Sequence, residues 1–189
     1  MDKKSEYGFT LIELVVAIAI IAIMVGIGVP AFISILPEIR LKRAASNLYS
    51  DMQSAKMGAV KDNNDWAIVF DTGSDQYFIC SGKGADDDWP AVADNVIEKT
   101  VDLTAYGSGI SYGHGNATVA IPGGAPADDI TYTDDVLVFN SRGTCNAGYV
   151  YIQNNTLKPN EHRNSYGAGT RTSGLVSLCK WFPASNNWD

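Results

Sequence analysis

The sequence is short of residues that carry chemistry. It has two histidines and three cysteines among 189 residues. The cysteines lie far apart, and both histidines fall in glycine-rich or polar segments. No group therefore has the spacing of a zinc ligand set or of a nucleophile with its base. We expect no catalytic residue, no metal site and no cofactor, and we predict that the chain is not an enzyme.

Basic residues are outnumbered. The 14 lysines and arginines stand against 21 acidic residues, which gives a net charge of −7. Residues 64–137 alone hold two lysines against thirteen acids, and such a stretch repels a phosphate backbone. Nucleic acid is therefore not an expected partner. The run Asp86–Asp88 lacks the spacing of a calcium-binding loop, so we interpret it as a solvated loop.

Ionisable side chains are missing altogether from Leu14 to Leu36. Almost every residue there is apolar, and about 20 such residues are enough to cross a bilayer. A secretory signal peptide has its cleavage site after the apolar core. Here a polar leader, residues 1–8, precedes the run, so its removal would leave the anchor, residues 9–37, on the chain. A lone acid, Glu13, borders the run, and a carboxylate in hydrocarbon costs roughly 2.5 to 3.5 kcal/mol.

The segment Gly8-Phe9-Thr10-Leu11-Ile12-Glu13 resembles the class III signal of type IV prepilins and type II secretion pseudopilins. This resemblance implies that prepilin peptidase cuts between Gly8 and Phe9, and that Phe9 becomes the N-methylated terminus. It also implies a single-pass protein of the bacterial inner membrane with its head in the periplasm. A secretion or pilus assembly platform would then build the chain into a filament with other pilins or pseudopilins.

Glu13 and Pro30 are the two residues of the anchor to which we assign roles. After cleavage, the cationic amine of Phe9, on the same or a neighbouring subunit, would pair with Glu13 and neutralise its charge in lipid. We expect this assembly contact to guide docking into a filament. Pro30 removes a backbone hydrogen bond, so we expect a helix kink there. A kink that melts during assembly and a passive kink are equal alternatives.

The next segment, residues 38–63, is amphipathic. Apolar residues recur at alternating spacings of four and three, at Leu41, Ala45, Leu48, Met52, Ala55 and Ala59. This period predicts a helix whose apolar stripe packs on a sheet, with charged residues such as Asp51 off the stripe. Arg40, Lys42 and Arg43 follow the span, whereas basic residues usually stay on the cytoplasmic side. We give the leader signal more weight than this charge rule, and we expect the head outside the cytoplasm.

The remaining residues, 64–189, predict a β-rich head. Segments 66–70 and 76–80, joined by a glycine-containing turn, predict a hairpin. Further strands are expected at 96–103, 117–121, 136–139, 149–153 and 175–182. Loops are expected at 82–90, 107–115, 122–129 and 156–172. The predicted fold class is α+β, in which a long N-terminal helix, with a membrane half and an amphipathic half, packs on an antiparallel β-sheet head.

The head resembles the GspH/FimT group of minor pseudopilins and minor pilins. Residues 136–143, Val-Leu-Val-Phe-Asn-Ser-Arg-Gly, and residues 172–178 carry the likeness. It implies a structural subunit of a type II secretion pseudopilus or type IV pilus, near the filament tip. The alternative is a tip minor pilin that binds a ligand for DNA uptake or adhesion. DNA-binding members carry a glycine-arginine-x-arginine pattern, and the matching residues 174–177, Gly-Leu-Val-Ser, lack both arginines.

Three cysteines permit one disulfide in an oxidising periplasm. Three pairings are possible, and we prefer Cys145 with Cys179 because both lie in the C-terminal strand region. Cys80 would then be a buried thiol within its strand.

Overall fold

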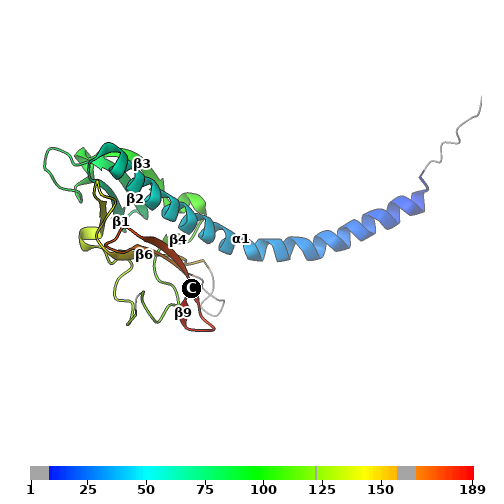
Figure 1. Ribbon diagram of the computed structural model, residues 1–189. Helices are drawn as coiled ribbons and strands as arrows, with labels where there is room; N and C mark the ends of the chain where they lie inside the picture. The colour runs from blue at the N-terminus through cyan, green and yellow to red at the C-terminus, as the bar shows by residue number, and fades with distance from the viewer. Residues whose placement is uncertain (1–8, 122, 157–164) are drawn as a thin grey trace, which may run out of the picture. The chain divides into compact units, whose positions relative to one another are not determined.

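The computed structural model describes residues 9–121, 123–156 and 165–189. The helix α1 spans Leu11–Asp62 (Figure 1). The chain divides into two compact units, one ending at Leu36 and the other spanning Pro37–Asp189, which we call the head. The predicted end of the helix is confirmed, because Asn63 has a positive φ of 50° and leaves helical geometry.

The head contains two antiparallel sheets, with strand orders β3-β2-β1-β5 and β4-β6-β7-β8-β9. The strands of the first sheet are β1 (Trp66–Asp71), β2 (Gln76–Gly82), β3 (Val96–Asp102) and β5 (Val136–Phe139). Those of the second are β4 (Ile110–Tyr112), β6 (Gly148–Asn154), β7 (Ser165–Thr170), β8 (Val176–Phe182) and β9 (Asn187–Trp188). Short 3₁₀ turns occur at η1 (Val92–Asp94), η2 (Leu103–Tyr106) and η3 (Thr133–Asp135). The predicted β1–β2 hairpin is confirmed by its register.

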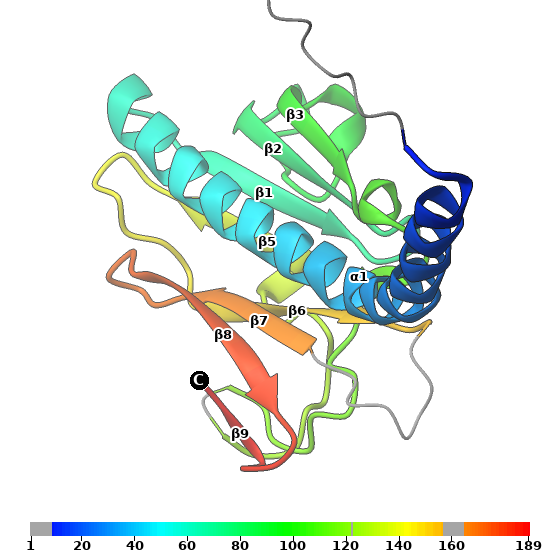
Figure 2. The ribbon, with the colours of Figure 1, turned by 90° about the vertical axis from the view of Figure 1, so that its right-hand side faces the viewer.

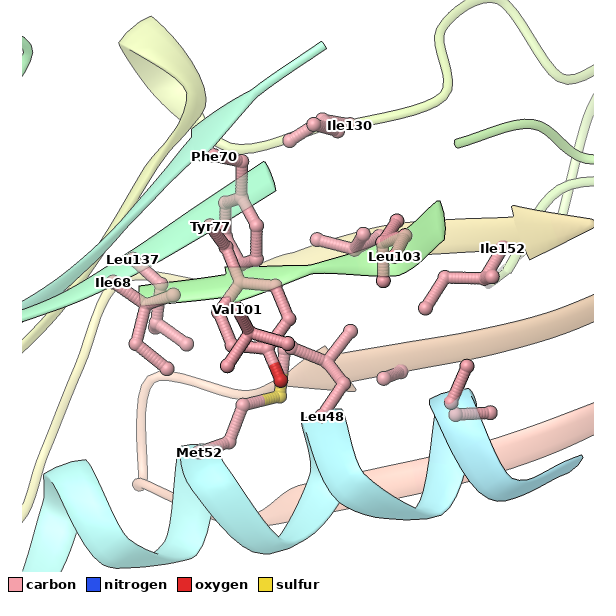
Figure 3. Close-up of a cluster of buried hydrophobic side chains, with 14 of the residues drawn as sticks. Leu48, Met52, Ile68, Phe70, Tyr77, Val101, Leu103, Ile130, Leu137 and Ile152 are labelled. Atoms are coloured by element: carbon pink, nitrogen blue, oxygen red, sulfur yellow. The ribbon is translucent and has the colours of Figure 1, made fainter. Parts of the chain in front are cut away.

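The head half of α1 packs against the strands (Figure 2). All six residues of the predicted apolar stripe are fully buried. One hydrophobic cluster joins them to Ile68 and Leu137 of the first sheet and to Val150 and Ile152 of the second. Figure 3 shows Leu48 of the stripe among side chains of the strands. The predicted α+β fold is confirmed, and the helix supplies the core that the two sheets share.

Strand β7 corrects the prediction of a surface loop at residues 156–172. It lies between β6 and β8, and all six of its residues are buried. A Cβ atom built on Gly169 would come within 2.1 Å of the Tyr149 ring of β6. Glycine is therefore required at this position, and the small residues that fit here lack the hydrophobic alternation by which strands are recognised.

Two shorter stretches also differ from prediction. Residues 117–121 form no strand, and β4 lies inside the predicted loop 107–115. The first stretch has a different task, because the backbone N–H of Ile121 donates to the Tyr151 hydroxyl at 2.8 Å. The end of this stretch thus bonds to a tyrosine of β6 instead of joining a sheet.

Candidate functional site: the apolar segment and the anchorage of its helix

The first unit presents an uncovered apolar surface, which we call the apolar segment, residues 11–36. Every side chain from residue 9 to residue 35 is exposed, and α1 is long and apolar enough here to cross a membrane. At 1.5 Å per residue the segment is about 39 Å long, more than the roughly 30 Å of a hydrocarbon core. Burial of apolar surface stabilises by about 25 cal/mol per Å². The segment therefore has the length and the exposed apolar surface of a membrane-spanning helix.

Thr10 and Glu13 shape the start of the helix. The backbone N–H of Glu13 donates to Oγ1 of Thr10 at 3.2 Å, and a threonine three residues before a glutamate is the spacing of a capping box. A carboxylate in the first turn also suits the helix dipole. The sequence interpretation of Glu13 passed over Thr10, although this spacing was the available signal. Among the described residues no basic group pairs with the Glu13 carboxylate.

Phe9 precedes the helix, and its side chain is 83% exposed. Gly8 and the rest of the leader lie outside the described residues, so cleavage and methylation remain predictions. Pro30 lies within α1, which continues without interruption on both sides. The kink at Pro30 also remains a prediction.

Asp51 ties the helix to the first sheet. Its side chain is nearly buried and accepts hydrogen bonds from the Tyr77 hydroxyl at 2.7 Å and from Nζ of Lys99 at 2.7 Å. Burial, with the hydrogen bond to Asp51, raises the pKa of the Tyr77 phenol above its ordinary value. The prediction that Asp51 lies off the buried stripe is wrong. A buried acid is tolerated on this face because two donors satisfy it.

A second anchorage lies where the head begins. Nζ of Lys180 on β8 donates to Oε1 of Glu38 at 2.6 Å, and this hydrogen bond raises the pKa of Lys180. One residue earlier, the carbonyl of Pro37 accepts from the side-chain amide of buried Asn154 at 3.4 Å. The first turn of the head helix is thus held by the second sheet.

The two short segments that carry the family likeness of the head meet at the far end of the helix. Nζ of Lys56 donates to the carbonyl of Gly174 at 2.9 Å. A Cβ on Gly174 would lie 1.8 Å from the carbonyl oxygen of Gly143, so the two turns are in close contact. Both glycines have positive φ values, 75° at Gly143 and 77° at Gly174. The turns are therefore parts of one structural junction on α1.

The positions that match the arginine pattern are occupied differently. Leu175 is 54% exposed, and the Ser177 hydroxyl donates to the carbonyl of Gly169 at 3.4 Å. Neither side chain offers a cation to a phosphate.

The predicted Cys145–Cys179 disulfide is not formed in this structure, where all three cysteines are free. The backbone N–H of Cys145 bonds to the carbonyl of Thr172, beside the turn before β8. Cys179 lies in the middle of β8, opposite Gly167 of β7. Although Cys145 and Cys179 both belong to the C-terminal strand region, their side chains form no disulfide. The prediction for Cys80 holds, and burial raises the pKa of its thiol to about 11.

A cleft of about 720 Å³ opens beside the ends of β6 and β7. Alanine and glycine residues form much of its lining, which also includes Asp128 and Arg171. It is a separate feature from the apolar segment and shares no residue with it.

An exposed apolar helix that continues into the core of a β head defines a pilin-like subunit. Comparison with family models gives two matches: the prokaryotic N-terminal methylation motif over residues 3–29, and the type II transport protein GspH over residues 44–171. The chain belongs to the GspH family, as its sequence resemblance predicted. Its role is that of a minor pseudopilin or minor pilin.

Solved structures resemble the chain more distantly. The minor pseudopilin EpsH from the type 2 secretion system of Vibrio cholerae is 15% identical, covering 74% of this chain and 95% of its own, with a TM-score of 0.48. The type IV minor pilin FimU of Pseudomonas aeruginosa is 17% identical, covering 80% and 94%, with a TM-score of 0.46. A search of curated proteins found no match.

Proposed function

We propose that the chain is a minor structural subunit of a type II secretion pseudopilus or type IV pilus, assembled near the filament tip through its apolar segment. Prepilin peptidase cuts between Gly8 and Phe9, and Phe9 is then N-methylated. The assembly platform moves the subunit from the inner membrane into the filament, with the head in the periplasm. The observation that carries the proposal is the exposure of residues 11–35 of the apolar segment.

The apolar segment suits two environments in succession. Before assembly, lipid covers it. In a filament, the apolar helices of neighbouring subunits take the place of lipid, so the same surface serves as anchor and as assembly contact. Such a contact is made by packing of apolar side chains and brings no charge to Glu13, which therefore requires a partner of its own.

The proposed partner exists only after cleavage. While Phe9 is joined to Gly8, its nitrogen is part of an amide and carries no charge. Cleavage makes it an amine, and this amine, on the same or a neighbouring subunit, then pairs with the Glu13 carboxylate. In hydrocarbon this pairing removes a cost of roughly 2.5 to 3.5 kcal/mol. Processing thereby becomes a condition for assembly.

The test compares Glu13→Ala with Asp65→Ala, a matched loss of one exposed acid on the head, in the source bacterium. Mass spectrometry of the mature chain reports the N-terminus, and the sheared filament fraction reports incorporation. We expect both variants to begin at methylated Phe9, and Glu13→Ala to be incorporated roughly tenfold or more below the wild type. Asp65→Ala should match the wild type.

Two results would contradict separate parts of the proposal. A mature wild-type chain that still begins at Met1 rules out the processing step. Normal incorporation of a correctly processed Glu13→Ala chain rules out the charge pairing and leaves the apolar contact as the sole assembly determinant.

A further inference from the structure

We propose that Arg40, Lys42 and Arg43 form a basic collar that binds the phosphate groups of anionic lipids where α1 leaves the bilayer. The inference rests on the membrane anchor of the proposed function and does not depend on filament assembly. Its partner is the lipid surface itself, at whichever leaflet the Pro37 end of the apolar segment emerges.

The collar is placed by the covalent chain. Its residues lie three to six positions beyond Pro37, the first residue of the head. At 1.5 Å per helical residue this is roughly 5 to 9 Å, comparable with the Debye length of about 8 Å at physiological salt. Headgroup phosphates at the end of the span are therefore within electrostatic reach of all three cations.

The collar is turned away from the core of the head. Arg40, Lys42 and Arg43 are all exposed, whereas the interleaved Leu41 and Ala44 are buried. The helix therefore uses one face for the sheets and leaves its basic side chains on the other.

No carboxylate in the described part of the chain neutralises the collar. None of its three cations forms a salt bridge there. The nearest acid along the helix, Glu38, is already paired with Lys180. The next, Asp51, is paired with Lys99. The local acids are thus occupied, and the three exposed cations have no ion-pair partner in the described part of the chain.

The side chain of Arg40 lies against Gly107 of the head. A Cβ on Gly107 would lie 2.7 Å from Cδ of Arg40, so the absence of a side chain at Gly107 makes room for the arginine stem. Beside it, Ile39 is 44% exposed. Basic heads on apolar stems next to an exposed apolar residue suit the boundary between lipid tails and headgroups. Lipid contact also gives a reason for basic residues directly after the span.

The test uses the full chain in detergent, equilibrated with equal amounts of phosphatidylglycerol and phosphatidylcholine. Native mass spectrometry then counts the lipids that each chain retains. We expect the wild type to retain phosphatidylglycerol preferentially. In the triple variant Arg40→Gln, Lys42→Gln, Arg43→Gln the preference should fall on the order of 100-fold, and in each single variant about fivefold.

The matched control is Lys61→Gln, Arg142→Gln, Arg171→Gln, which removes the same number of lysines and arginines from exposed positions. Arg142 and Arg171 belong to the junction near Lys56, 19 positions beyond Pro37. The control should keep the wild-type preference. An unchanged preference in the collar variants, or an equal loss in the control, overturns the proposal. Thermal melting verifies the fold, and the single variants provide the same test if the triple variant melts early.

Discussion

The two halves of α1 have the same backbone and opposite surroundings. From Leu11 to Leu36 no apolar side chain is buried, while from Pro37 to Asp62 eight residues are buried against the sheets. The first half is more apolar than the second, yet the second holds the core. Hydrophobicity alone therefore does not identify the core of this chain. The head buries the apolar surface of the second half of α1, whereas the apolar surface of the first half stays exposed in the isolated chain.

The acids of the two halves repeat this contrast. Asp51 has its donors within the head, from two strands of the first sheet. Glu13 has no cationic partner among the described residues. The donors of Asp51 lie inside the head and contribute to its stability, whereas the proposed role of Glu13 is in assembly.

The largest expected effect comes from the same substitution made in each half. Leu48→Ala leaves a cavity in the shared core and should destabilise the head by about 2 to 5 kcal/mol. Leu14→Ala, on an exposed side chain, should change it by less than about 0.5 kcal/mol. Denaturant unfolding of the head in detergent, followed by tryptophan fluorescence, measures both. Equal losses would mean that the halves are not energetically distinct.

Removal of each acid sharpens the comparison further. Asp51→Ala leaves the buried Tyr77 hydroxyl without an acceptor, so the head should lose about 1 to 3 kcal/mol. Glu13→Ala should leave the unfolding free energy of the head unchanged. The double variant Asp51→Ala, Tyr77→Phe should recover part of the loss, because it removes both partners. If the double variant adds two independent losses, the hydrogen bond is not the cause.

The smallest effect is a pH dependence of the head that comes from the buried Cys80 thiol. The Cys80 thiol has a pKa of about 11 when folded, against 9.0 ordinarily. The folded state holds this proton more tightly, so its contribution is complete below pH 9 and is lost as the pH rises toward 11. Between pH 8 and 10 the loss is about 1 kcal/mol. Cys80→Ala should show a correspondingly shallower decline, and an identical decline would exclude the thiol.

Local, repetitive features of the fold could be predicted from the sequence. The stripe of α1 repeats over five turns, and the β1–β2 hairpin combines two alternating segments with a glycine turn. Strand β7, Ser-Tyr-Gly-Ala-Gly-Thr, could not be predicted, because the Tyr149 ring that lies against it requires glycine at position 169. That requirement comes from the facing strand β6 and leaves no periodic signal within β7 itself.

The candidate site divides in the same way. The leader and Glu13 form a contiguous motif, and the family they indicate is confirmed. Asp51 was misassigned because a charged residue on a helix is usually solvated, and its donors, Tyr77 and Lys99, are brought to it only by folding. The Cys145–Cys179 pairing failed because nearness of segments does not specify the direction of a side chain.

The shared core has a consequence for how the protein can be divided. The apolar stripe of α1, from Leu41 to Ala59, packs against side chains of both sheets in one core. A fragment that starts at the first strand, near Trp66, would expose the inner faces of both sheets at once and would be expected to aggregate. A fragment intended for study in water must therefore start before Leu41, and one that starts at Pro37 also keeps the contacts of Glu38 and Asn154.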